Sequence, residues 1–313
     1  MNEPNSRIDT RAVLGPLTLA TPILTASGTF GYGEEYEGLV DFSAIGAAAT
    51  KGITLEPRSG NRDPRICETP SGMLNAIGLE NPGVDVFIEK KLGWLVDRGV
   101  PVIANINGTS PEEYAELATR LSGVAGIVAL EVNVSCPNVK HGGMQFGVVP
   151  SATTEVVAAT RAATDVPLIV KLSPNVTDIV EIARAAVAGG ADILSLINTL
   201  VGMSIDIQTR RPRVSRNTAG LSGPAVKPVA VRMVYQVHQA MPDIPIIGMG
   251  GIMTGADAAE FMLAGASAVA VGTASFVSPR SAEDVLAGLS DYCLLAGIER
   301  ASDLVGRVEP YDD

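Results

Sequence analysis

The stretch Glu131-Val-Asn-Val-Ser-Cys-Pro-Asn138 is the part of this chain from which the fold can be worked out. Its polar and apolar residues alternate, so Glu131, Asn133 and Ser135 would point to one face of a strand and the two valines to the other. The proline that follows ends the run, because proline cannot continue a central strand. A strand with a polar face does not simply bury that face in a core, so we interpret its end, at Cys136, as a functional position.

The segment after this strand, Val139-Lys-His-Gly-Gly-Met-Gln-Phe-Gly147, is rich in glycine, and we expect it to act as a movable lid. A lone cysteine is more often a buried structural residue. The polar neighbours of Cys136 and its place at the start of a loop favour a chemical role instead.

Similar strand patterns recur along the whole chain, and helical or turn-rich segments separate them. Strands are expected at 22–28, 44–52, 101–107, 126–135, 167–173, 193–198, 244–251 and 268–272. Helices are expected from Ser110, at 153–163, at 177–188, after Pro224 and at 256–264. A short lead-in at 10–19 would form a hairpin or cap, and two long polar connections, 56–82 and 208–217, interrupt the pattern.

Strand and helix therefore alternate eight times, which predicts an α/β fold with a parallel sheet. Eight such units in a chain of 313 residues indicate a closed (β/α)8 TIM barrel with long loops at its C-terminal face. Because no linker divides the chain, we expect one domain over residues 1–313. An open doubly wound sheet is the alternative, but no Gly-x-Gly-x-x-Gly pattern follows the first strand to support it.

The composition narrows the class of protein. Hydrophobic residues make up 46% of the chain and charged residues only 18%, below the usual quarter, which favours a surface partly covered by another subunit. The net charge of −11 argues against a nucleic-acid partner, because phosphate backbones attract basic surfaces. Small anionic ligands remain compatible with it, since a few lysines make a local positive site.

The cysteines and the apolar segments indicate the compartment. The three cysteines, Cys67, Cys136 and Cys293, are odd in number and without paired spacing, which is typical of a reducing cytoplasm. No Cys-x-x-Cys pair predicts a zinc or iron–sulfur site in this chain. Since no signal peptide and no membrane-spanning run are seen, we expect a cytoplasmic protein that does not bind a membrane.

In barrels of this kind the active site lies at the C-terminal ends of the strands. The side chains expected there are mainly amides and lysines, without a carboxylate pair or a histidine, which argues against a glycosidase or a Cys–His protease. We expect both histidines, His141 and His238, to have no catalytic role. The polar residues at the strand ends are Ser27, Lys51, Asn105, Asn107, Asn133, Lys171, Asn198 and Thr199, together with the thiol Cys136.

The ends of the last two strands carry the pairs Gly250-Gly251 and Gly272-Thr273, each leading toward a helix, and Gly223 precedes another helix. Backbone N–H groups in such turns, beside helix N-termini, bind phosphate, and barrels commonly bind phosphate after strands seven and eight. Any one of these pairs could simply form a tight turn. Together, on adjacent strands, they predict a phosphate site.

A phosphate site, several amides, two lysines and one thiol suggest flavin mononucleotide (FMN) with a planar heterocyclic substrate beside it. Asparagine side chains offer a donor and an acceptor, as imide edges require. Lys171 would stabilise the reduced flavin electrostatically. The alternative for Lys171 is a lysine paired with a carboxylate inside the barrel.

Three motifs carry a resemblance to a known family: Glu131–Asn138, Asn75-Ala-Ile-Gly-Leu-Glu-Asn-Pro-Gly83 and Gly248-Met-Gly-Gly-Ile252. They resemble class 1 dihydroorotate dehydrogenases in their NAD-linked 1B form, over essentially the full chain. The resemblance implies an FMN-containing barrel that oxidises dihydroorotate to orotate in de novo pyrimidine (UMP) synthesis. It also implies that Cys136 is the base that removes the C5 proton while the C6 hydride goes to flavin N5.

The resemblance also assigns binding residues. Those expected to hold the substrate are Lys51, Asn75, Ala76, Ile77, Gly78, Leu79, Asn133, Asn138, Asn198 and Thr199. Those expected to hold one FMN per chain are Ser27, Lys51, Gly52, Asn105, Asn133, Lys171, Ile197, Gly223, Gly250, Gly251, Gly272 and Thr273. No metal site is expected.

Members of class 1B pass electrons to NAD through a second subunit that carries FAD and a [2Fe–2S] cluster. The resemblance therefore implies such a partner in a heterotetramer of two plus two, with the catalytic chains forming a homodimer. Two alternatives remain open. One is a class 1A homodimer that reduces fumarate, and the other is a phosphate-binding barrel without redox chemistry.

Overall fold

The computed structural model describes residues 8–135 and 146–311. Eight parallel strands close into a barrel in the order β10-β15-β16-β3-β4-β7-β8-β9, which confirms the predicted (β/α)8 fold. Each expected strand is present, but with shorter bounds, most of all where 44–52 was expected and only Ala47–Ala49 forms. The strands are β3 (Ile23–Thr25), β4 (Ala47–Ala49), β7 (Val102–Ile106), β8 (Ile127–Asn133), β9 (Leu168–Lys171), β10 (Ile193–Leu196), β15 (Ile246–Met249) and β16 (Ala268–Val271).

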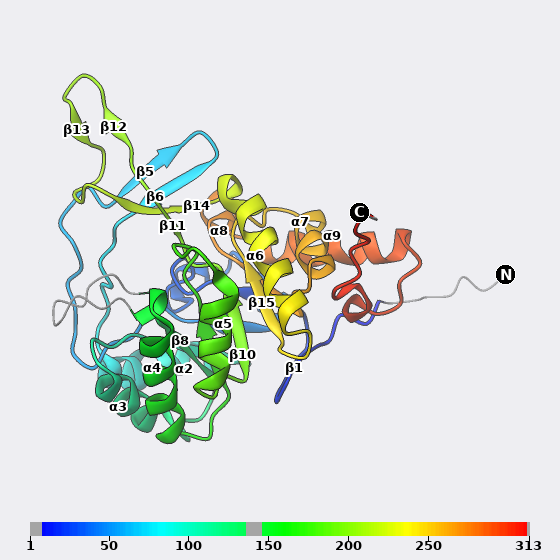
Figure 1. Cartoon of the computed structure of the whole chain (residues 1–313), viewed down its shortest axis with the longest axis horizontal. Coiled ribbons are helices and arrows are strands. Elements are labelled where there is room, and N and C mark those ends of the chain that lie inside the picture. Colours follow the sequence, from blue (N-terminus) through cyan, green and yellow to red (C-terminus); the bar gives the residue numbers. More distant parts are fainter. Residues whose placement is uncertain (1–7, 136–145, 312–313) are drawn as a thin grey trace.

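Helices surround the barrel (Figure 1). They are α1 (Val84–Val86), α2 (Leu92–Val96), α3 (Pro111–Leu121), α4 (Pro150–Ala162), α5 (Ile179–Ala188), α6 (Lys227–Ala240), α7 (Gly255–Leu263), α8 (Ala274–Val277) and α9 (Ser281–Leu295), with a π-turn, Phe87–Lys91, joining α1 to α2. Side chains cap several of them; Ser110 accepts a hydrogen bond from the Glu113 amide at α3, as its sequence predicts. In the part of the chain that is described, no helix is long and apolar enough to cross a bilayer.

The first crossover departs from a strict alternation of strands and helices. Between β3 and β4, where every residue is described, the chain forms only two 3-10 turns, Glu34–Tyr36 and Phe42–Ala44. Phe30 stacks on Tyr36 with ring centroids 4.5 Å apart, so aromatic packing takes the place of a helix here. The last helix, α9, lies against β3 and the second of these turns.

The lead-in forms the expected hairpin, β1 (Ala12–Leu14) paired with β2 (Leu17–Leu19). Its apolar residues belong to the same cluster as the inward-facing residues of all eight barrel strands, such as Ile103 and Ile169. Its turn, at Gly15, lies beside Asp192 and Pro245, which directly precede β10 and β15. The hairpin therefore closes the N-terminal end of the barrel.

The connection 56–82 and the two strands that flank the connection 208–217 form a second, antiparallel sheet beyond the C-terminal ends of the barrel strands. Its order is β11 (Leu200–Gly202), β14 (Ala219–Ser222), β6 (Gly72–Asn75) and β5 (Ile66–Thr69). Figure 1 shows β5, β6 and the small hairpin of β12 (Ile205–Asp206) and β13 (Arg211–Pro212) extending together from one side of the barrel. We call the sheet of β11, β14, β6 and β5 the roof sheet. It has a small core of its own around Leu74, Val214 and Ala219.

Candidate active site

A buried carboxylate lies at the centre of the barrel. Glu131, on β8, is 2% exposed. Asn105 Nδ2 donates to its Oε2 at 2.6 Å, and Ser195 Oγ donates to its Oε1 at 2.7 Å. Lys171 Nζ lies 3.8 Å from Oε2. Since an isolated buried charge is costly, these contacts explain how a carboxylate is tolerated here.

Lys171 ends β9, and its side chain is almost completely buried. Its Nζ donates to Ser27 Oγ at 3.1 Å, the one hydrogen bond that it makes within residues 8–135 and 146–311. An ammonium group has three N–H donors. Lys171 therefore combines the contact with a barrel carboxylate, one of its two expected roles, with donors that can serve a bound ligand.

Four asparagines form a continuous chain across the barrel mouth. Asn107 Nδ2 donates to Asn105 Oδ1 at 2.8 Å, and Asn133 Nδ2 donates to Asn107 Oδ1 at 2.8 Å. Asn198 Nδ2 donates to Asn133 Oδ1 at 3.3 Å. Strands β7 and β8 and the segment after β10 thus bring the predicted amides together.

Gly52 and Lys51 follow β4 next to this chain. A Cβ at Gly52 would lie 2.4 Å from Asn107 Nδ2, so only glycine lets the backbone approach the amides this closely. Burial lowers the pKa of Lys51, while Glu80 raises it and Arg65 lowers it further. Lys51 is thus a half-buried lysine that loses its proton more easily than a surface lysine does.

The predicted phosphate-binding glycines also come together. Thr273 Oγ1 donates to Ser222 Oγ at 2.8 Å, which joins the end of β16 to the end of β14. A Cβ at Gly251 would lie 2.9 Å from the Gly223 carbonyl oxygen, so the turns after β14 and β15 also adjoin. Gly223, Gly250 and Gly251 all have positive φ, at 96°, 124° and 88°, a conformation that favours glycine.

The helix after Gly250-Gly251 contributes less to this cluster than the sequence suggests. Its first residue is Gly255, and Thr254 and Asp257 form a capping box there, so its own side chains satisfy its N-terminus. In contrast, α8 begins directly after Thr273, and the 3-10 turn Pro224–Val226 begins directly after Gly223.

The predicted substrate residues divide into two groups. Asn75 Nδ2 donates to the Gly220 carbonyl oxygen at 3.3 Å, and a Cβ at Gly220 would meet Thr199 Oγ1, so Asn75 and Thr199 lie on either side of β14. In the segment from Ala76 to Leu79, the backbone bonds instead to the segment 61–65. In the described part of the chain, those four residues make no hydrogen bond with the asparagine chain.

Several sequence predictions cannot be placed in this geometry. Cys136, Asn138 and His141 lie outside the described residues. Ile197 is buried, and a Cβ at Gly250 would lie 3.3 Å from its side chain. His238, on α6, packs against Gly265 and Gly306. Burial lowers the pKa of its imidazole.

No role was predicted for Glu131, Ser195 or Asn175, and Asn107 was expected at a strand end without a function of its own. Asn175 Nδ2 donates to the Thr199 carbonyl oxygen at 3.1 Å. A spacing of two positions along a strand could have indicated two of these residues, because such neighbours point to the same face. Asn107 follows Asn105, and Ser195 precedes Ile197, at that spacing.

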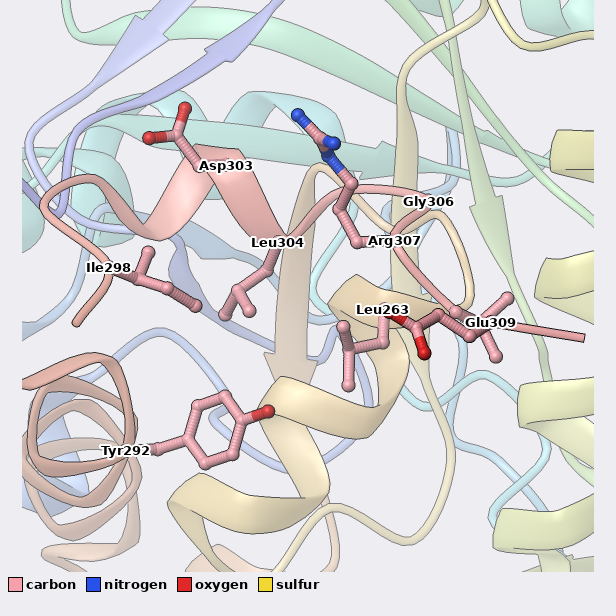
Figure 2. A pocket seen from close by; sticks show the side chains of 9 residues that line it. Leu263, Tyr292, Ile298, Asp303, Leu304, Gly306, Arg307 and Glu309 are labelled. Atoms are coloured by element: carbon pink, nitrogen blue, oxygen red, sulfur yellow. The ribbon is translucent and has the colours of Figure 1, made fainter. Parts of the chain in front are cut away.

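A separate hollow of about 490 Å³ lies between α7, α9 and the C-terminal segment, where Leu263 and Tyr292 lie opposite Leu304 and Ile298 (Figure 2). None of the predicted site residues lines it. The candidate site is therefore defined by its hydrogen bonds.

Comparisons with known proteins identify the family. The family model described as dihydroorotate dehydrogenase matches residues 11–293. The protein from Trichlorobacter lovleyi named dihydroorotate dehydrogenase B (NAD(+)), catalytic subunit, is 57% identical over 95% of this chain and 97% of its own. The protein of the same name from Geobacter sulfurreducens is 56% identical over 99% of this chain and 100% of its own.

A solved structure shares the fold. The dihydroorotate dehydrogenase of Eimeria tenella, in complex with ferulenol, superposes with a TM-score of 0.81 over 98% of this chain and 90% of that one, at 24% identity. This likeness concerns the fold alone. By the family model and by its relatives, the chain belongs to the dihydroorotate dehydrogenase family.

Proposed function

We propose that this chain is the catalytic subunit of an NAD-linked dihydroorotate dehydrogenase, which oxidises (S)-dihydroorotate to orotate in de novo pyrimidine synthesis. Family membership and the names of the relatives support the reaction. The observation that carries it is the buried Lys171, with N–H donors left for a ligand, beside the chain of asparagines at the barrel mouth.

The asparagine chain suits a planar ring with imide edges. Asn133, Asn198, Asn75 and Thr199 would hold orotate, because amide and hydroxyl groups both donate and accept hydrogen bonds. Asn138 and the segment Ala76–Leu79 would complete the pocket. The half-buried ammonium of Lys51 would serve an anionic group of either ligand.

The residues present fit FMN, one per chain, because the buried Lys171 offers donors and the three glycine turns adjoin. When bound, FMN would accept a hydride from the substrate. Residues proposed to hold its ring are Ser27, Lys51, Gly52, Asn105, Asn133, Lys171 and Ile197, and those proposed to hold its phosphate are Gly223, Gly250, Gly251, Gly272 and Thr273.

Cys136 would act as the base that removes the proton from C5 of the substrate. A thiol with a pKa of about 8.5 suits this role in mildly alkaline solution. The asparagines would orient the ring so that this proton faces the thiolate, which is the positional contribution that catalysis requires.

A partner subunit is part of the proposal. The relatives are named catalytic subunits, which supports a separate subunit for electron transfer. We propose that it carries FAD and a [2Fe–2S] cluster, that two catalytic chains pair as a homodimer, and that the cytoplasmic complex is a heterotetramer of two plus two. Strongly exposed apolar residues such as Ile207, at 87%, and Leu295, at 91%, fit surfaces covered by other chains.

The reaction is tested by mixing the purified chain with dihydroorotate in the absence of oxygen. We expect a yellow protein whose flavin absorbance bleaches. A colourless chain that takes up no flavin would instead favour a barrel without redox chemistry.

The acceptor is tested separately. The isolated chain should reduce dyes or oxygen but hardly any NAD, and the FAD and iron–sulfur subunit should switch on NAD reduction. Rapid turnover with fumarate would favour a class 1A enzyme, and fast NAD reduction by the chain alone would contradict both classes.

A further inference from the structure

Glu131 occupies a position that the reaction proposed above does not use. Both of its carboxylate oxygens are engaged, Oε1 by Ser195 and Oε2 by Asn105. In the described part of the chain, Lys171 is the only cation within ion-pair distance of it. Glu131 and Lys171 thus form a buried pair of opposite charges on neighbouring strands, β8 and β9.

The pair is not explained by stability. A buried ion pair is often no more stable than apolar residues of similar volume, because both charges lose their hydration. The barrel interior accommodates such apolar residues two positions earlier on the same strands. Ile169 precedes Lys171 and Ile193 precedes Ser195 at this spacing, and both isoleucines are fully buried. A carboxylate in the adjoining layer therefore points to a function of its charge.

The geometry of the pair leaves Lys171 available to a ligand. The hydrogen bonds from Asn105 and Ser195 hold the carboxylate in place, with Oε2 3.8 Å from Nζ. This separation is too long for a hydrogen bond, so the carboxylate balances the ammonium charge without occupying its donors. Ser27 accepts one donor and helps to fix the direction of the others.

We propose that Glu131 is a positioning residue that holds Lys171 in place and offsets its charge, and that it thereby sets how strongly the site favours reduced over oxidised FMN. This inference rests on the proposed function. A reduced flavin carries more negative charge than an oxidised one, so an unbalanced cation beside it would favour the reduced form. The ion pair moderates that preference.

The test is the midpoint potential of FMN bound to Glu131→Gln. A glutamine keeps the shape of the side chain, can accept from Asn105 and can donate to the Ser195 hydroxyl. With the negative charge gone, we expect reduced FMN to gain about tenfold in affinity over oxidised FMN, which raises the potential of a two-electron couple by about 30 mV. An unchanged or lower potential would overturn the proposal.

Ser195→Ala is the matched control. It removes one hydrogen bond to the same carboxylate but leaves the charge, so the potential should stay at the wild-type value. If Ser195→Ala shifted the potential as much as Glu131→Gln does, geometry and not charge would be responsible, and the proposal would be wrong.

A second measurement needs no flavin and does not depend on the single Glu131 variant. In the flavin-free protein, Lys171→Met leaves Glu131 as a buried charge without an opposite charge beside it, so the melting temperature of this variant should fall well below that of the wild type. Adding Glu131→Gln to this variant should restore most of the loss. A double variant no more stable than Lys171→Met would contradict the charge pairing. A wild-type chain that binds no FMN would defeat the proposed function, while this comparison would still test the pairing.

Discussion

Two layers of the barrel interior, one step apart on the same strands, differ completely in chemistry. The lower layer is Ile103, Ala129, Ile169 and Ile193, and the upper layer is Asn105, Glu131, Lys171 and Ser195. Each upper residue follows a lower one by two positions on β7, β8, β9 or β10, so both point inward. The alternation of side chains along each strand thus positions an apolar core and then a polar network.

The difference follows from what covers each end of the barrel. The hairpin β1–β2 closes the lower end, where burial of apolar side chains stabilises the fold by roughly 25 cal/mol for each Å² removed from water. The roof sheet lies beyond the upper end, where polar groups must find partners or ligands. Changes in the lower layer should therefore affect stability, and changes at the upper end should affect binding and chemistry.

The largest effect is expected at the upper end. Cys136→Ala should slow the reduction of bound flavin by dihydroorotate by about 10²–10⁴-fold, because it removes the proposed general base. Its melting temperature should stay at the wild-type value. Stopped-flow measurements in the absence of oxygen give the rate.

Cys67→Ala is the control, since Cys67 lies on β5 in the roof sheet and has no proposed role. Cys136→Ser should keep some activity, with its rise moved to higher pH because an alcohol is a weaker acid than a thiol. A wild-type rate in Cys136→Ala would show that another residue is the base.

The lower end should show the opposite behaviour. Leu14, in the hairpin, is fully buried, so Leu14→Ala should cost about 2–5 kcal/mol of stability through lost burial and the cavity left behind. Its neighbour Val13 is 63% exposed, and Val13→Ala should change stability by no more than about 0.5 kcal/mol. Thermal unfolding compares the two, and flavin reduction should be equal in both. Equal melting temperatures would mean that the hairpin does not close the barrel.

A glycine of the phosphate cluster should affect stability and binding together. Gly251→Ala forces a side chain into positive φ and places its Cβ 2.8 Å from that of Lys227, which should cost about 1–3 kcal/mol and weaken FMN binding. Gly93→Ala, in α2 with no atom within 4 Å of the new Cβ, should instead gain up to about 1 kcal/mol. Flavin titration and thermal unfolding measure both effects. Unchanged FMN affinity in Gly251→Ala would remove this turn from the phosphate site.

The smallest effect concerns pH. Burial lowers the pKa of Lys51, so its positive charge is lost at lower pH than that of a surface lysine. Because the charged form attracts anions, orotate affinity should fall as pH rises through that lowered pKa. Lys51→Arg stays charged over this range and should abolish the fall. Titrations from neutral to alkaline pH provide the comparison, and parallel curves for the two proteins would exclude Lys51 as the titrating group.

The sequence was sufficient for the barrel because its strands are regular and their C-terminal ends carry the polar residues. Their position at the ends of the expected strands pointed to Asn105, Asn133 and Lys171. It could not identify Glu131 as the partner of Lys171, because the two residues meet across neighbouring strands and are 40 positions apart in the sequence.

The roof sheet was missed for a similar reason. Its central pair joins Asn75 to Gly220, and no local pattern in the two polar connections indicates a pairing over such a distance. Which side chains point inward at a strand end can be predicted locally, because residues two positions apart share a face. Contacts between distant segments depend instead on the closed barrel that brings the segments together.

The hairpin at the lower end also has a consequence for how the chain is made. Residues 12–19 leave the ribosome early, yet the cluster that receives Leu14, Leu17 and Leu19 includes Ala268 and Ala270 on the last barrel strand. During synthesis, the apolar cluster that buries these leucines is complete only after β16 has been made. The hairpin thus emerges well before the strands that it packs against, and its brevity limits how much apolar surface the nascent chain exposes meanwhile.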